Sequence, residues 1–211
     1  EDMLTEAVSV ADALPYQVTE TCPGTAALQE LHARLQGAEQ PVVILGGSRW
    51  SDQAVRDIAT FAEHWQLPVY CSFRRQMLFP ANHASYAGDL GLGVNPKLLA
   101  RMRASDLVLV LGARLSEIPS QGYELFDIPN PAQPLVHVHA DADELGRLYR
   151  PAQTIHATPQ AMAAALVSLL PASAPGWAGH TQAARAEYLA WSDPAPIRIP
   201  GQLQMGAVMQ H

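Results

Sequence analysis

The sequence predicts an α/β fold built on a doubly wound parallel sheet of five or six strands, with helices on both faces. Five short, mostly apolar runs recur along the chain, and segments with helical apolar spacing lie between several of them. Runs that are apolar at consecutive positions have no polar face, as in parallel strands covered on both sides. Their alternation with amphipathic helices favours parallel strands joined by right-handed crossovers. We therefore expect a Rossmann-like sheet.

The stretch from Pro41 to Trp65 holds the first strand and helix. Val42–Leu45 is an apolar run, Gly46-Gly47 ends it, and Ser51 is a suitable cap for the helix that follows. A glycine turn before a helix N-terminus favours an anion such as a phosphate. The pair is only part of a G-x-G-x-x-G fingerprint, so a plain strand-to-helix turn is favoured over a phosphate site.

The other elements follow from the same signals. Leu107–Leu111 is the clearest strand, because five consecutive apolar residues have no polar face and need cover on both sides, as in a central parallel strand. Each such side chain contributes about 1.5–3 kcal/mol when fully buried. Asn95-Pro96 and Thr158-Pro159 are typical helix starts. Further expected elements are a helix at Thr25–Gly37 and strands at Val69–Ser72, Leu135–His139 and Gln153–Ile155.

Residues 73–94 form a long irregular stretch, and loops of this length usually carry function or contact a partner. Gly88, Gly91 and Gly93 do not match the dinucleotide fingerprint, and we interpret them as turns.

Two groups of residues, in the fourth expected strand and directly after it, could bind a metal or a ligand. His137 and His139 share one face, but no third ligand suggests itself, so buried or loop-end, hydrogen-bonded imidazoles are favoured over a metal site. Asp141 and Glu144 resemble a capping box. A ribose contact from Asp141 is the alternative, because acids at strand ends bind ribose in nucleotide-binding sheets.

Composition narrows the possible partners and compartment. The net charge is −7 and the basic residues do not cluster, which argues against nucleic acid and an anionic membrane surface. Cys22 and Cys71 are far apart and make no disulfide framework, so a cytoplasmic location is expected.

The proline-rich tail after Pro171 contains a helical stretch at 181–191, and residues 201–211 start a helix that stops without a cap. We expect the chain to be an excerpt of a longer protein.

Taken in order, these stretches resemble the central domain of thiamine-diphosphate-dependent enzymes, in the group of acetolactate synthase, pyruvate oxidase and benzoylformate decarboxylase. The landmarks are PVVILGG, SDLVLVLGARL (105–115) and HVHADADELGR (137–147). Glu1–Leu4 is similar to the end of the family's pyrimidine-binding domain, and PGQLQMGAVMQH (200–211) to the start of its diphosphate-binding domain. The resemblance implies a lead-in at 1–24, a central Rossmann-like domain at 25–172, and a linker plus the start of the next domain at 173–211.

The resemblance also implies that this chain alone is not an enzyme. In the family, a glutamate in the first domain and a G-D-G motif in the third serve thiamine diphosphate and Mg²⁺, and both would lie outside this chain. No catalytic or metal-binding residue is therefore expected here. The implied role is a central domain of a carboligase or decarboxylase acting on 2-keto acids, flanked by its catalytic domains in a homo-oligomer.

Some relatives bind FAD or an ADP moiety at the strand ends of this domain. The matching positions here, implied by the resemblance, are Gly46, Gly47, Ser72, Gly112, Arg114 and Asp141. His139, Ala157 and Ile118 stand where the family carries two acids and an arginine, and these departures favour an empty cleft over a nucleotide site.

Two other functions stay open on the sequence. One is a free-standing nucleotide-binding enzyme of the dehydrogenase or sirtuin-like type, based on the strand-end glycines and Asp141. The other is a dimerisation or interaction module, because Trp177, Trp191, Met205 and Met209 are side chains that normally become buried.

Overall fold

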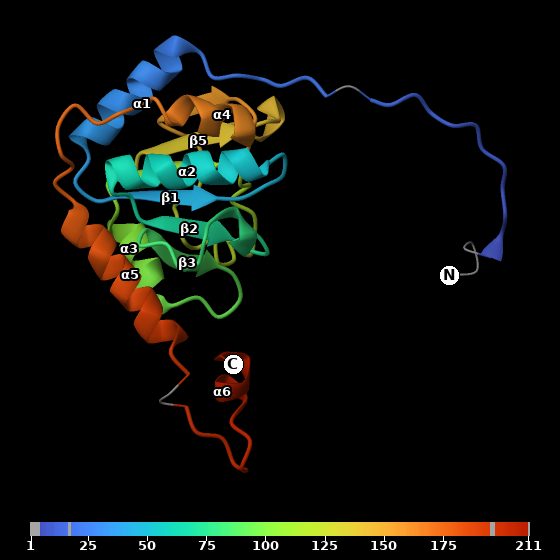
Figure 1. Cartoon of the computed structure of the whole chain (residues 1–211). Helices are drawn as coiled ribbons and strands as arrows, with labels where there is room; N and C mark the ends of the chain where they lie inside the picture. Colours follow the sequence, from blue (N-terminus) through green and yellow to red (C-terminus); the bar gives the residue numbers. More distant parts are fainter. Residues whose placement is uncertain (1–4, 17, 195–196, 211) are drawn as a thin grey trace.

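The computed structural model describes residues 5–16, 18–194 and 197–210. A parallel sheet of six strands forms its centre, and helices pack around the sheet (Figure 1). The strand order is β3-β2-β1-β4-β5-β6, which is the doubly wound Rossmann order and confirms the predicted fold class. The strands are β1 (Pro41–Leu45), β2 (Val69–Ser72), β3 (Tyr86–Leu90), β4 (Leu107–Leu111), β5 (Leu135–His139) and β6 (Gln153–His156). The helices are α1 (Thr25–Gly37), α2 (Asp52–Trp65), α3 (Pro96–Ala104), α4 (Pro159–Leu166), α5 (Ala178–Ser192) and α6 (Met205–Gln210).

Alternate residues of the central strands feed two separate cores. Val43 and Leu45 of β1 join the core that α1, α2 and α4 cover, whereas Val42 and Ile44 join the core that includes α3. Because side chains alternate across a strand, a fully apolar strand needs a cover on each side. Helices therefore lie on both faces, as predicted.

The predicted helix caps are present. The Ser51 hydroxyl accepts the Ala54 N–H at 3.2 Å, and the Asn95 side chain accepts the Lys97 N–H at 3.0 Å. Thr158 caps α4 in the same way. Among the described residues, no helix has the length and apolarity needed to cross a lipid bilayer.

The stretch 73–94 is not simply a loop, because β3 forms within it. β3 pairs with β2 through a register shift between Val69 and Cys71, and Gly88 there has a φ of 114°. A bulge with a positive-φ glycine, next to the charged Asp89, breaks the alternating apolar pattern from which strands are recognised. The expectation of an irregular segment was wrong for this part.

The chain between β4 and β6 departs from the expected alternation with helices. The connection from β4 to β5 is a series of turns whose buried side chains Leu115, Leu125 and Phe126 take the place of a helix on that face. Between β5 and β6 only a 3-10 turn, η3 (Ala142–Glu144), forms. Asp141 caps that turn through the Asp143 N–H at 3.1 Å.

The tail beyond residue 172 contributes to the folded body. Trp177 is buried, stacks on Trp65 with ring centroids 6.3 Å apart, and donates Nε1–H to the Trp65 carbonyl at 2.8 Å. α5 then packs along β3 and α3. Trp191, Met205 and Met209, by contrast, are 54% exposed or more. Burial within the chain is therefore confirmed for Trp177, and a contact of the other three with a second copy stays a prediction.

The two tail tryptophans provide a matched test of this packing. We expect Trp177→Ala to lower the free energy of unfolding by about 3–5 kcal/mol, because it removes a large core side chain. Trp191→Ala, at an exposed position of α5, should change it by less than about 0.5 kcal/mol. Urea denaturation measures both, and equal effects would contradict the assignment of Trp177 to the core.

Candidate functional site

A cleft of about 530 Å³ opens at the carboxyl ends of the central strands. It lies where β1 and β4 are neighbours and the strand order reverses, which is where ligands bind in doubly wound sheets. The residues that line it are Gly47, Ser48, Arg49, Arg75, Gly112, Arg114, His139, Ala140, Asp141 and Pro159.

Two glycines let the turns after β1 and β4 cross at the floor of the cleft. Gly47 and Gly112 have φ values of 71° and 73°. A Cβ atom on Gly47 would lie 2.0 Å from the Gly112 carbonyl oxygen, and one on Gly112 would lie 2.7 Å from the Gly46 carbonyl oxygen. Since such contacts are not possible, only glycine allows this close backbone approach.

The six positions proposed from the sequence separate into two groups. Gly47, Gly112, Arg114 and Asp141 line the cleft. Gly46 and Ser72 lie beneath it, because a Cβ on Gly46 would approach the Ser72 Cβ to 2.9 Å and Ser72 is buried. These two residues support the turn, and a ligand in the cleft would meet the other four.

Sequence reasoning did not select three further residues of the cleft wall. Arg49 follows the Gly46-Gly47 turn, Arg75 follows β2, and His139 ends β5. Their positions directly after strands were the available signal, because the carboxyl ends of parallel strands meet at one edge of the sheet. His139 was considered with His137 as a metal-site candidate and as a departure from the family pattern, but it was not among the six proposed positions.

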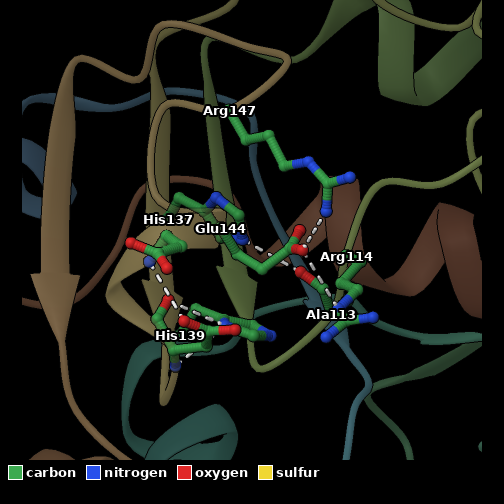
Figure 2. A network of polar contacts seen from close by, with 8 residues as sticks. Ala113, Arg114, His137, His139, Glu144 and Arg147 are labelled. Carbon is green, nitrogen blue, oxygen red and sulfur yellow. Dashed lines mark hydrogen bonds and ion pairs between the residues drawn. The ribbon is translucent and has the colours of Figure 1, made fainter.

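Carboxylates of the chain pair with two of the arginines that line the cleft, Arg114 and Arg49. The Glu144 side chain is nearly buried, and its Oε1 forms ion pairs with Arg147 Nη1 at 2.6 Å and with Arg114 Nε at 3.4 Å. Figure 2 shows the two guanidinium groups approaching Glu144 from different sides. Glu144 therefore binds arginines and does not act as the second acid of a capping box. Arg49 is paired with Glu20, which comes from the segment before α1.

Both histidines of β5 are buried and hydrogen-bonded, as predicted. His137 Nε2 lies 2.9 Å from the Ala113 carbonyl oxygen (Figure 2), and His139 Nδ1 accepts the Asp141 N–H at 3.0 Å. Burial lowers the pKa of His137, and the nearby His139 lowers it further, although the Ala113 contact opposes this. Within the part of the chain that the structure describes, no group of three or more His, Cys, Asp or Glu is arranged to hold a metal ion.

The fold and the cleft define a doubly wound α/β domain. Its cleft lies where the strand order reverses, has backbone as its floor and is lined by arginines. Residues 28–166 match the family described as "Thiamine pyrophosphate enzyme, central domain". The chain belongs to this family of central domains, and this membership does not favour the free-standing nucleotide-binding enzyme or the interaction module.

Individual relatives agree with this family. A sulfoacetaldehyde acetyltransferase from Alcaligenes xylosoxydans xylosoxydans is 30% identical over 83% of this chain, and an acetolactate synthase from Mycobacterium avium is 26% identical over 74% of it. The matches cover only 29% and 25% of those proteins. A benzoylformate decarboxylase from Polynucleobacter necessarius has the same fold over 79% of this chain, with a TM-score of 0.56 and 19% identity.

The lowered pKa of His137 leads to a prediction about pH. The unfolded chain takes up a proton near pH 6.5 and the folded chain resists it, so the free energy of unfolding should fall as the pH drops below about 6.5. His180, whose pKa burial also lowers, acts in the same direction. Urea denaturation at pH 7.5 and 5.5 should show a smaller loss of stability for His137→Gln than for the unchanged chain.

The exposed His64 provides the control for this experiment. His64→Gln should retain the full loss of stability between the two pH values. If His137→Gln retains it too, protonation of His137 does not oppose folding.

Proposed function

We propose that this chain is the non-catalytic central part of a larger thiamine-diphosphate-dependent carboligase or decarboxylase acting on 2-keto acids or related acyl donors. The match of residues 28–166 to the central-domain family carries the proposal. Related proteins named as an acetyltransferase and a synthase support an acyl-transfer reaction of the whole protein. Its thiamine diphosphate and Mg²⁺ would bind in the flanking domains, and the whole protein would be a homo-oligomer in the cytoplasm.

The role of the domain in such a protein would be to hold two catalytic domains at a fixed spacing. A sheet with both faces covered is rigid, which suits a spacer. The described residues 5–16 run away from the sheet as an extended chain (Figure 1), consistent with a lead-in at 1–24. Residues 25–172 would be the central domain and 173–211 the linker and start of the next domain, with α5 of that linker docked on the central sheet. The motifs assigned to residues 1–4 and 211 lie outside the described residues.

The proposed role places the groups that bind thiamine diphosphate and its metal in the flanking domains, outside this chain. We expect the 211-residue chain, mixed with thiamine diphosphate, Mg²⁺ and pyruvate, to release no carbon dioxide or acetolactate above the protein-free blank. A full-length acetolactate synthase in the same assay is the positive control. Product formation by this chain would contradict the non-catalytic role.

We also propose that the strand-end cleft binds a phosphate-bearing ligand such as an ADP moiety, alone or as part of FAD. Its position at the switch point, its backbone floor and its arginines support this proposal. Arg114, Arg49 and Arg75 would meet the diphosphate. Asp141 is the acid available to the ribose, since His139 and Ala157 stand where two other acids are found in FAD-binding relatives.

Arg114 and Arg147 make a matched pair for testing the cleft, because both bind Glu144 but only Arg114 lines the cleft. We expect ADP to raise the melting temperature of the chain. Arg114→Ala should weaken ADP binding about tenfold, the loss expected for one charge-assisted hydrogen bond of about 1.5 kcal/mol. Arg147→Ala should change it less than about twofold. Isothermal calorimetry measures both affinities, and no binding of ADP to the unchanged chain would contradict the proposal.

A further inference from the structure

The carboxylate of Glu20 lies at the rim of the strand-end cleft, far in sequence from the residues that bind it. One oxygen accepts a hydrogen bond from the Arg49 guanidinium and the other from the Thr158 hydroxyl. Backbone contacts flank the carboxylate: Arg49 also donates to the Thr19 carbonyl at 3.3 Å, and the Thr158 N–H donates to the Thr21 carbonyl at 2.9 Å. Residues 19–21 are therefore fastened to the start of α4.

The groups around Glu20 have the chemistry of an oxyanion site. Thr158 is 1% exposed, and its hydroxyl both caps α4 and donates to the carboxylate. The positive end of the α4 dipole and the Arg49 guanidinium add to the attraction. The pKa of Glu20 is lowered, mainly by the Thr158 hydrogen bond and further by Arg49 and Gln160. These groups would donate hydrogen bonds to a phosphate oxygen as readily as to a carboxylate oxygen.

This oxyanion site is continuous with the cleft. Arg49 and the first helical residue, Pro159, both line the cleft wall. Glu20 thus neutralises one of the cleft's cations from the side. The Glu20 and Arg49 side chains are about one-third exposed, at 33% and 31%, and ion pairs with this exposure are weak enough for a ligand anion to displace.

We propose that Glu20 occupies a phosphate site at the rim of the cleft, so that a phosphate-bearing ligand and the lead-in compete for Arg49 and Thr158. Binding of the ligand releases residues 18–22 from α4. In the other direction, docking of these residues on α4 weakens the binding of the ligand. Since these residues join the sheet to the preceding part of the chain, occupancy of the cleft is coupled to how that part is attached. This inference rests on the phosphate-binding role proposed for the cleft.

Glu20→Gln tests the competition in the 211-residue chain, with inorganic pyrophosphate as the probe at fixed ionic strength. Glutamine keeps the length of the side chain but removes its charge, so pyrophosphate should bind at least fivefold more tightly than to the unchanged chain. Glu6→Gln, an exposed glutamate of the same lead-in, is the matched control and should leave the affinity within twofold. Adding Arg49→Ala to Glu20→Gln should remove the gain.

Cys22 allows the release of the lead-in to be observed directly. It is exposed and the other cysteine, Cys71, is buried, so a thiol-reactive fluorophore labels residue 22 selectively. In the labelled chain, pyrophosphate should lower the fluorescence anisotropy as the segment is released. In labelled Glu20→Gln the anisotropy should already be low and respond little.

The outcomes separate this inference from the proposed function. If pyrophosphate and ADP bind but Glu20→Gln has unchanged affinity and the anisotropy stays constant, the competition is wrong and the cleft proposal stands. If the unchanged chain binds ADP but pyrophosphate binds only to Glu20→Gln, competition is supported in its strongest form. If neither the unchanged chain nor Glu20→Gln binds either probe, both proposals are wrong.

Discussion

The close crossing of two backbone turns, at Gly47 and Gly112, is the constraint on which the site depends. After β1 the chain passes to the face covered by α2, and after β4 it passes to the opposite face, where Leu115 is buried. The two turns separate from a point of contact at which a Cβ would lie 2.0 Å from a carbonyl oxygen. The cleft is the space left between them, and backbone forms its floor.

The sequence was sufficient to predict the elements whose signals are local. β1 and β4 are apolar at every position because helices or buried loop residues cover both faces, and side chains of Ser51 and Asn95 mark the helix starts. β3 was not predicted because it lies at the edge of the sheet, where a bulge at Gly88 is tolerated and the apolar pattern is broken. The turns after β4 form no helix because their apolar side chains reach the core from loop positions.

The candidate site was predictable only where it depends on topology. Parallel strands bring their carboxyl ends to one edge, so Gly112, Arg114 and Asp141 could be placed together before their contacts were known. Charge pairing could not be predicted in this way. Glu20 and Arg49 are 29 positions apart, and Glu144 meets Arg114 only because the turn after β5 folds toward the exit of β4. Such pairs depend on tertiary positions that leave no periodic signal in the sequence.

Charge compensation has a consequence for the kind of ligand that the cleft can select. A ligand with one negative charge gains little at an arginine that a carboxylate already neutralises, because it must first replace an existing ion pair. A diphosphate, the ligand class proposed for the cleft, offers several oxygens at once, and these would meet more than one of the lining arginines Arg49, Arg75 and Arg114. The resident carboxylates therefore lower affinity for all anions but lower it most for small monovalent ones. On the proposal that the cleft binds a phosphate-bearing ligand, the carboxylates that pair with its arginines would therefore make it selective for polyanions over small carboxylates.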